Sequence, residues 1–418
     1  MTGEGRPRQR FALALGGVAL VGFGVRVVYT LVVAPDELGF DAIWYELQSE
    51  TLAEGHGYVD PDLFYRVGRS VPTANFPPLW PMVLALASVV GLDGTVSHQL
   101  VGAFLGTITV VVTGLLGRRV ADARVGVVAA GFVSLSPLLI AADGSLMAES
   151  LFVVLITTTV LIAYRALSTG SWGWFVLIGV LLGAAALARS DGLIVAPLLI
   201  GVTAWRTTAP SARRLALGCL AGGIVVLVLV PWVVRNERQL GEPVALSSNS
   251  GSVLEGANCP TTYAGKLLGG WDGDCLVVTR RAGQSELDWA AEGRRAGIDY
   301  AADHLTRLPL VGTTRVLRAW SLWNPVDQAE LEVVESRDRE WQIAGGVVTL
   351  AMLALAIPGT GRLARGPAPI VPMVAVVGGV TLAALIAHGN TRFTLAGQPI
   401  VAVAAAAFVS SVWTRRRR

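Results

Sequence analysis

The stretch RFALALGGVALVGFGVRVVYTLVVAPDELGFDAIWY, residues 10–45, joins an apolar run long enough to enter a bilayer to a polar segment that carries a carboxylate, Asp41. Further apolar stretches follow throughout the 418-residue chain. Hydrophobic residues make up 53% of the sequence and charged residues only 15%, whereas about a quarter of the residues in a soluble protein are charged. This composition predicts an all-α protein that crosses the membrane repeatedly.

We expect ten transmembrane helices, together with helices that lie on the outer membrane surface. The expected spans lie near residues 11–34, 98–117, 125–141, 148–165, 172–188, 190–205, 215–235, 341–357, 368–387 and 394–413. The segment 77–92 is apolar but only about 16 residues long, short of the ~20 that a spanning helix needs. We therefore predict a surface helix there. The first apolar run is longer than that of a cleaved signal peptide, which predicts a retained anchor.

The arginines predict the orientation, because short connections rich in Lys and Arg stay in the cytoplasm. With the N-terminus inside, the inner face collects Arg6, Arg8, Arg10, Arg118, Arg119, Arg124, Arg165, Arg206, Arg213, Arg214, Arg362, Arg365 and Arg415 to Arg418. The short outer connections keep only Arg189 and Arg392. We expect a plasma-membrane protein with both termini in the cytoplasm. A net charge of +3 gives no support to a nucleic-acid partner.

Three parts are expected along the chain. Residues 1–235 form a transmembrane module with an outer loop at 35–76 and the surface helix at 77–92, residues 236–340 form an extracytoplasmic region, and residues 341–418 form a C-terminal three-helix segment. The spacing from Asp41 onward predicts a short helix ended by glycine. The second outer region should begin irregularly at Asn236 and become helical from about Ser285.

The cysteines fit this sidedness. Cys259 and Cys275 share the outer region, where oxidising conditions permit a disulfide, and a bridge there would stabilise the loop by ~3 kcal/mol. Two free thiols are the alternative. Cys219 falls in a span and is interpreted as a buried small residue. No histidine is near either outer cysteine in sequence, so a zinc site is not expected.

One arginine, Arg26, falls inside the first span. A charge at the centre of a lone helix costs ~2.5–3.5 kcal/mol, so Arg26 either faces a protein or water-filled interior or reaches toward the surface.

Asp41 is the candidate for chemistry. A carboxylate beside aromatic residues at a membrane surface is desolvated enough to act as a general base. The alternative is a solvated or helix-capping aspartate.

Several short motifs resemble those of the GT-C superfamily of multispanning glycosyltransferases, in particular glycosyltransferase family 39, which includes the protein O-mannosyltransferases and aminoarabinose transferases. The motifs are Asp41-x-x-x-Tyr45, Phe76-Pro77-Pro78-Leu79-Trp80-Pro81, Leu146-Met147-Ala148-Glu149-Ser150-Leu151-Phe152, Leu187-Ala188-Arg189-Ser190-Asp191-Gly192, Pro231-Trp232-x-x-Arg235-Asn236 and His388-Gly389-Asn390-Thr391-Arg392-Phe393. They occur in the family's order, on the side that the arginines place outside.

This resemblance implies an inverting transferase that moves a sugar from a polyprenyl-phosphate carrier to an acceptor outside the membrane. Asp41 matches the family's carboxylate and would accept the proton of the acceptor hydroxyl. The candidates for binding the lipid phosphate are Arg189, Arg392 with His388, and Arg66 or Arg69, since a guanidinium suits a phosphate bidentately.

The sequence also departs from the family. Ala42 stands where the O-mannosyltransferases have a glutamate, and Trp44 and Phe76 stand where the aminoarabinose transferases have an arginine and a lysine that bind the phosphate. The sugar, the acceptor and the dependence on a divalent metal therefore stay open.

Other polar and aromatic residues have two interpretations. Glu149 either shapes the acceptor site around Asp41, alongside Tyr45, or holds a metal, or caps its helix near Asp143 and Ser145. Arg189 and Asp191 either serve the site or form a plain ion pair. Trp271, Trp289, Trp320 and Trp323 either stack on sugars or belong to an interfacial aromatic belt.

Two other classes of function compete with the transferase. A transporter or lipid flippase would show paired broken helices and ionisable residues near the membrane midplane, whereas here the polar residues gather at the outer ends. A non-enzymatic envelope scaffold would leave Asp41 and Arg189 without a shared cavity.

Overall fold

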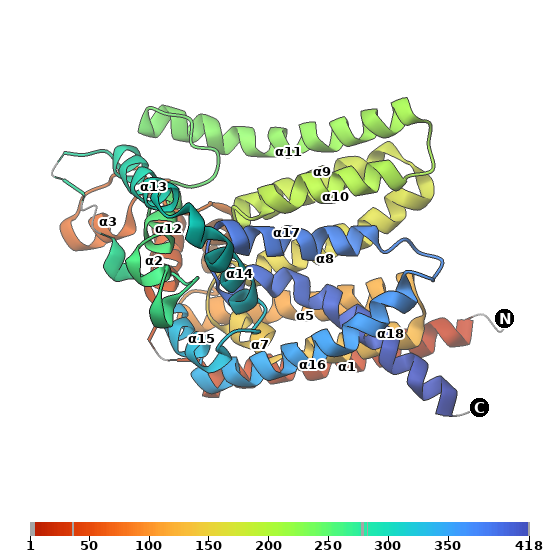
Figure 1. The fold of residues 1–418 in the computed structure, drawn as a ribbon. Helices are drawn as coiled ribbons and strands as arrows, with labels where there is room; N and C mark the ends of the chain where they lie inside the picture. The colour runs from red at the N-terminus through yellow and green to blue at the C-terminus, as the bar shows by residue number, and fades with distance from the viewer. Residues whose placement is uncertain (1–4, 36, 277–279, 282, 417–418) are drawn as a thin grey trace.

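A computed structural model describes residues 5–35, 37–276, 280–281 and 283–416 (Figure 1). Within these ranges the fold is built of α-helices and short 3-10 turns, with one isolated β-bridge between Val59 and Pro72 and no strand. The expected all-α fold is confirmed.

Six helices are long and apolar enough to cross a membrane. They are α1 (Gly5–Val32), α5 (Thr95–Val120), α8 (Glu149–Thr169), α11 (Ser211–Leu240), α16 (Arg339–Leu363) and α18 (Gln398–Arg416), the last together with the 3-10 segment η6 (Thr391–Gly397) before it. Three shorter apolar helices lie alongside them, α9 (Trp172–Ala188), α10 (Gly192–Arg206) and α17 (Val371–Ile386). The chain is a multi-pass membrane protein, and the number of ten spans stays a prediction.

The expected span at 125–141 is two helices rather than one. α6 (Ala123–Ser134) and α7 (Pro137–Gly144) meet at an angle of 55°. Pro137 is the first residue of α7, and proline has no N–H to continue the hydrogen bonding of α6. Taken together as one bent span, the pair would be a seventh crossing.

Arg26 of α1 stabilises this break. Its guanidinium donates to the carbonyl oxygens of Val133 (3.2 Å) and Ser134 (3.1 Å), which end α6, and pairs with the Asp143 carboxylate of α7 at 2.7 Å. Arg26 is only 1% exposed. The protein-facing interpretation is therefore correct, and the reach toward the surface is wrong, because the charge has a full set of partners inside the bundle.

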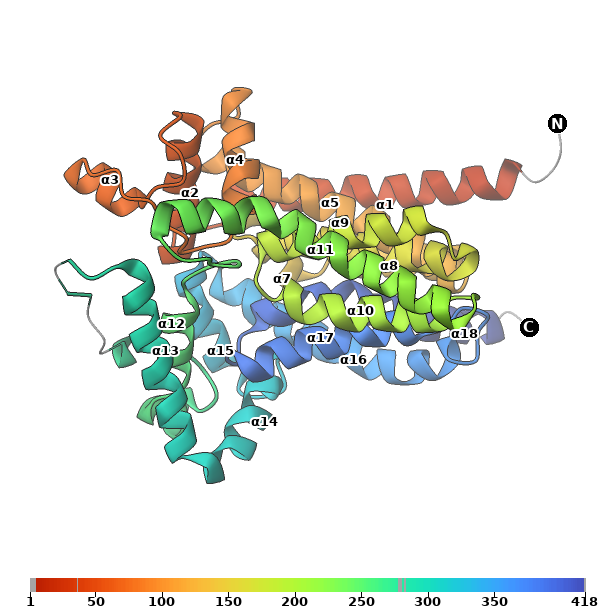
Figure 2. The same ribbon diagram turned by 90° about the horizontal axis from the view of Figure 1, so that it is seen from above.

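The remaining helices gather at one end of the bundle, opposite the first turn of α1 and the last turn of α18 (Figures 1 and 2). They are α2 (Phe40–Ala53), α3 (Pro61–Val67), α4 (Leu79–Val89), α12 (Ser250–Ala257), α13 (Glu286–Asp303), α14 (Leu308–Ala319) and α15 (Pro325–Glu332). We call this the outer end, after the orientation that the arginines predict.

Within the outer end, two predicted helices are present near their expected bounds. α2 covers the segment that begins at Asp41, and Gly55 (φ 83°) turns the chain just after it. α13 begins after Ser285, whose hydroxyl accepts a hydrogen bond from the N–H of Asp288.

The segment expected as a surface helix contains α4. It buries Trp80 and Leu84 against the bundle and leaves Leu86 and Val89 about two-thirds exposed (66% and 67%). The Trp80 indole N–H donates to the carbonyl oxygen of Leu146 at 3.0 Å.

Two expectations for the segment around α11 are wrong. The irregular part of the second outer region does not begin at Asn236, because α11 continues to Leu240 and Gly241 ends it with a left-handed φ of 84°. Cys219 is exposed rather than buried, because it lies on the outward face of α11.

Candidate active site

Five segments bring charged side chains together at the outer end of the bundle: the first turn of α2, the first turn of α8, the α9–α10 turn, the segment from the end of α15 to α16, and η6. The charge cluster, as we define it, consists of Asp41, Glu149, Arg189, Asp191, Glu332, Glu335, Arg337 and Arg392. Its members come from positions up to 351 residues apart in sequence. The fold therefore builds one site from distant motifs.

Arg392 lies at the centre of the cluster. Its Nε donates to Glu149 Oε1 at 2.8 Å, and its Nη1 donates to Asp41 Oδ2 at 3.1 Å and to Glu335 Oε1 at 3.3 Å. Arg392 is 14% exposed, whereas the Asp41 side chain is 33% exposed. Asp41 is thus the carboxylate of this set that is most open to an incoming molecule.

Arg189 joins the α9–α10 turn to α8. Its Nε and Nη2 bind Asp191 Oδ2 at 3.0 and 2.8 Å, and its Nη1 donates to Glu149 Oε1. Glu149 is fully buried, and α8 has no side-chain cap at its N-terminus. The helix-capping interpretation of Glu149 is therefore wrong: its carboxylate holds two arginines in place instead.

Three members of the cluster were not singled out from the sequence. Arg337 is completely buried, 3.5 Å from Glu335, 3.8 Å from Glu332 and 3.9 Å from Glu149. Its three guanidinium nitrogens make no hydrogen bond within the described residues. The signal in the sequence is the dense run of charges EVVESRDRE, residues 332–340, immediately before an apolar span.

The electrostatic balance favours a basic Asp41. The cluster has five carboxylates, Asp41, Glu149, Asp191, Glu332 and Glu335, and three arginines. Burial raises the pKa of the Asp41 carboxyl, and the negative charges of Glu335 and Glu149 raise it further, while Arg392 opposes them. A carboxylate with a raised pKa is a better proton acceptor near neutral pH.

Tyr45 and His388 border the cluster as neutral groups. Tyr45 is 2% exposed and packs on Phe76, with the ring centroids 5.0 Å apart, and burial raises the pKa of its phenol. Burial, followed by the charges of Arg392 and Arg315, lowers the pKa of His388 to about 3. His388 therefore supplies no positive charge to a phosphate at neutral pH, unlike Arg392.

Trp271 lies beside His388, with the ring centroids 6.5 Å apart. Its indole N–H donates to the carbonyl oxygen of Ser252 at 3.0 Å, and the residue is 36% exposed. Trp271 belongs to the loop that a disulfide between Cys259 and Cys275 closes.

Arg66 and Arg69 do not join the charge cluster. Arg66 is 79% exposed and pairs with Asp62 one turn earlier in α3. Arg69 is exposed just after α3. Over the described part of the chain, neither arginine has an ion pair with a member of the cluster.

The cluster does not present a metal site in this structure. Within the described ranges, no group of three His, Cys, Asp or Glu side chains is placed to hold a metal ion. Its carboxylates face arginines instead, as Glu149 does.

The arrangement of the helices is similar to that of solved membrane proteins with the GT-C type of fold. Two structures of the oligosaccharyltransferase of Archaeoglobus fulgidus match the chain. One is tethered to an acceptor peptide containing the NVT sequon (TM-score 0.55, 15% identity), and the other, AglB, is in complex with an inhibitory peptide and a dolichol-phosphate (TM-score 0.52, 14% identity). The matches cover 97% and 98% of this chain but 50% and 51% of those chains. The chain therefore spans about half the length of these relatives, and identities this low establish the fold alone.

Residues 75–234 also match the family model of dolichyl-phosphate-mannose-protein mannosyltransferases. This range includes the motifs around Phe76, Glu149, Arg189 and Trp232 that carried the resemblance in sequence. ArnT from Cupriavidus metallidurans, bound to undecaprenyl phosphate, matches with a TM-score of 0.46 and 18% identity over 96% of this chain and 78% of that chain, a score too low to establish a shared fold. No curated protein matches the sequence at a significant level.

Proposed function

We propose that the protein is an inverting glycosyltransferase that moves a sugar from a polyprenyl-phosphate carrier to an acceptor on the extracytoplasmic side of the plasma membrane. The observation that carries the proposal is the pairing of Asp41, a third exposed, with Arg392 at the outer end of a membrane bundle. The site combines a candidate proton acceptor with cations at one end of the membrane bundle.

In the proposed reaction, Asp41 accepts the proton of the acceptor hydroxyl as the acceptor oxygen forms a bond to the anomeric carbon of the sugar. The bond between that carbon and the phosphate oxygen breaks, and the polyprenyl phosphate leaves with the electron pair. Arg392 and Arg189 are the cations placed to stabilise the charge that develops on the phosphate. Glu149 pairs with both arginines and fixes their positions before the reaction, so the two guanidinium groups need not reorganise during it.

A lipid-linked donor is supported by the relatives. One matched structure is of a complex with a dolichol-phosphate, and the family model that matches residues 75–234 is named for dolichyl-phosphate-mannose-protein mannosyltransferases. The arginine distribution supports an outer active site, because the inner connections carry most of the arginines. Since the chain spans half the length of the oligosaccharyltransferase, its acceptor need not be theirs.

The transporter or flippase alternative is not favoured. The matching family model is named for a transferase, and so are the matched structures of the Archaeoglobus fulgidus oligosaccharyltransferase. The buried charges that pair with Asp41 and Arg189 lie at the outer end of the bundle, whereas a transport pathway needs ionisable groups near the midplane.

The test uses purified protein in lipid nanodiscs with radiolabelled polyprenyl-phosphate mannose and polyprenyl-phosphate arabinose. Release of polyprenyl phosphate from one donor, together with a strong but incomplete loss of release in Arg392→Gln, is the expected result and names the sugar. If neither donor is turned over or bound, the proposal is contradicted and transport becomes the better hypothesis.

A further inference from the structure

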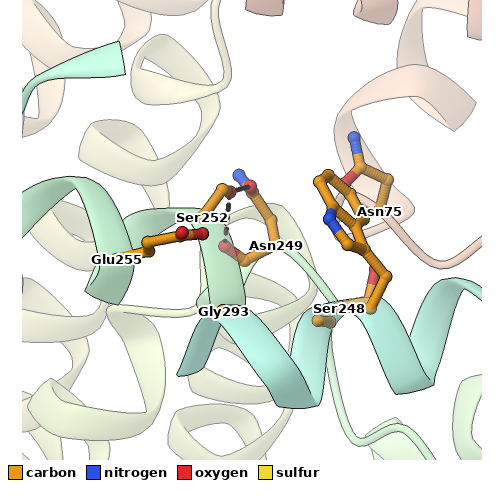
Figure 3. A pocket seen from close by; sticks show the side chains of 8 residues that line it. Asn75, Ser248, Asn249, Ser252, Glu255 and Gly293 are labelled. Carbon is orange, nitrogen blue, oxygen red and sulfur yellow. Dashed lines mark hydrogen bonds between the residues drawn. The ribbon is translucent and has the colours of Figure 1, made fainter. Parts of the chain in front are cut away.

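A second polar site lies beside the charge cluster, between α12, α13 and the segment before α4. We call it the Asn75 recess, a shallow hollow, open to solvent, that admits a group the size of a water molecule or a hydroxyl. Its lining residues are Asn75, Ser248, Asn249, Ser252, Glu255, Trp289, Ala290 and Gly293. Figure 3 shows Asn75 on one side of the recess and Ser252, Asn249 and Glu255 on the other.

The end of α11 supports the two chain segments that carry Asn75 and Ser248 of the recess. Arg235 donates to the carbonyl oxygens of Thr73 (2.6 Å) and Tyr58, and so fixes the chain that leads to Asn75. Trp232 and Asn236 donate to the carbonyl oxygens of Leu246 (2.8 Å) and Val244 (2.9 Å), on the chain that leads to Ser248. The motif Pro231-Trp232-x-x-Arg235-Asn236 therefore positions both of these chain segments.

Glu286, the first residue of α13, joins the same two chain segments. It accepts hydrogen bonds from the Thr73 hydroxyl (2.6 Å), the Ala74 N–H (3.0 Å) and the Ser248 hydroxyl (2.6 Å). The Ser248 N–H donates directly to the Ala74 carbonyl oxygen at 2.8 Å. The recess is thus preorganised, which reduces the entropy lost when a ligand binds.

The recess presents neutral hydrogen-bonding groups next to an aromatic ring. The side-chain amide of Asn75 and the Nδ2 of Asn249 make no hydrogen bond to the described residues. A Cβ at position 293 would lie 2.9 Å from Glu255 Oε2. Because Gly293 has no side chain, it does not cover the Glu255 carboxylate at the bottom of the recess. Amides, a carboxylate and a partly exposed Trp289 suit the hydroxyls and the C–H face of a sugar ring.

Two contacts join the recess to the charge cluster. The Ser247 hydroxyl, next to Ser248 of the recess, lies 3.4 Å from the hydroxyl of Ser190, which stands between Arg189 and Asp191. On the other side, Asn75 precedes Phe76, whose ring packs on Tyr45 one turn after Asp41 in α2. The chain segments that line the recess are therefore continuous with segments that contact the charge cluster.

We propose that the Asn75 recess binds a sugar residue of a carbohydrate acceptor, with one hydroxyl entering the recess and the ring at its mouth. The proposal rests on the transferase function proposed above and names the class of its acceptor. A carbohydrate is favoured over a peptide because the open groups are amides matched to hydroxyls, with a single carboxylate and no cation lining the recess.

The test separates acceptor binding from chemistry. Purified protein in nanodiscs is mixed with neutral disaccharides of mannose, glucose and arabinose, and binding is measured by saturation-transfer NMR. We expect one of them to bind, and Asn75→Ala and Asn249→Ala each to weaken that binding about tenfold, as for the loss of a hydrogen bond. Gln239→Ala, which removes an exposed amide from the last turn of α11, is the matched control and should bind as wild type.

Donor hydrolysis by water distinguishes the two proposals. Asn75→Ala should hydrolyse the polyprenyl-phosphate sugar at the wild-type rate while the acceptor KM rises about tenfold. Asp41→Asn should lose hydrolysis and keep disaccharide binding. The recess proposal is overturned if no disaccharide binds, if both recess variants bind like wild type, or if a Ser/Thr-containing peptide is the acceptor with the same KM in wild type and Asn75→Ala.

Discussion

Asp41 illustrates how the same residue has a different chemical character in the folded protein than in the free chain. At the end of an exposed loop it would be an ordinary solvated carboxylate. In the structure it lies near Glu149 and Glu335, and burial together with these charges raises its pKa above the ordinary value of 3.8, while Arg392 lowers it. Arg392 therefore lowers the pKa of Asp41 as well as donating a hydrogen bond to its carboxylate.

This balance predicts the acid side of the pH–rate profile. A general base works only when it is deprotonated, so kcat/KM should fall as the pH falls through the raised pKa of Asp41, at a pH above 3.8. Removing the cation in Arg392→Gln should move this limb to higher pH, because Arg392 is the group that opposes the shift. Exposed Arg66→Gln is the control. A limb at the same pH in Arg392→Gln would show that Asp41 is not the titrating base.

At the scale of elements, α2 is positioned by its contact with the 3-10 turn η5 (Val333–Glu335). A Cβ on Gly39, the residue before α2, would lie 1.7 Å from the carbonyl oxygen of Val334. The Gly39 N–H also donates to the Ser336 hydroxyl at 2.6 Å. This close approach brings Asp41 and Glu335 to the same guanidinium.

Gly39→Ala should therefore separate α2 from η5. Overpacking against backbone typically costs ~1–3 kcal/mol, and we expect a lower melting temperature and at least a tenfold loss of transfer. The control is Gly24→Ala in α1, where a Cβ meets nothing within 4 Å. Wild-type activity in Gly39→Ala would mean that the contact does not position Asp41.

The buried pair of Arg26 and Asp143 holds three helices together, α1, α6 and α7. In Arg26→Ala, Asp143 is left without its charge partner and the end of α6 without its donors, so we expect ~3–5 kcal/mol of destabilisation in detergent. The double variant Arg26→Met with Asp143→Leu should recover part of that loss, since it leaves no buried charge unpaired. Equal melting temperatures for Arg26→Ala and wild type would contradict this account.

The sequence predicted the helices better than their interruptions. The length of the apolar stretches located α1, α5 and α8, and apolar residues at helical spacing located α13. The break before Pro137 was missed because its orphan carbonyls are satisfied by Arg26, from a helix more than 100 residues earlier in the chain. The sequence around Pro137 does not show which residue donates to those carbonyls.

The site was predicted in the same partial way. Asp41, Glu149, Arg189, Asp191 and Arg392 were all proposed from short motifs, and the fold brings them into contact. Arg337 was missed because its contacts with the cluster depend on complete burial, which the sequence does not show. Arg66 was included because the sequence does not distinguish an arginine that reaches the site from one that pairs with a neighbour on its own helix.

For the whole molecule, the bundle puts the first turn of α1 and the last turn of α18 at one end and the charge cluster at the other (Figure 1). Which end faces the cytoplasm is a prediction from the arginines. If it is correct, donor and acceptor meet outside the membrane.

Cysteine labelling tests this orientation. In a Cys219→Ser background, Glu242→Cys, just after α11, should react with a membrane-impermeant maleimide in intact cells. Ser168→Cys, near the end of α8, should react only after permeabilisation; both positions are exposed in the fold. The opposite pattern would place the charge cluster in the cytoplasm.

The central claim is that Asp41 is the proton acceptor of a sugar transfer, and the most direct measurement is turnover of a radiolabelled polyprenyl-phosphate sugar by Asp41→Asn. Because the pKa of Asp41 is raised in the folded protein, ionisation of this carboxyl destabilises the fold as the pH rises from 3.8 through the raised pKa. The uncharged amide of Asp41→Asn should therefore give a melting temperature at pH 7 that is equal to or higher than that of wild type. The account predicts a folded protein with turnover reduced at least ~100-fold, as for loss of a general base, and wild-type turnover in the exposed control Asp62→Asn. Full turnover by Asp41→Asn would contradict it.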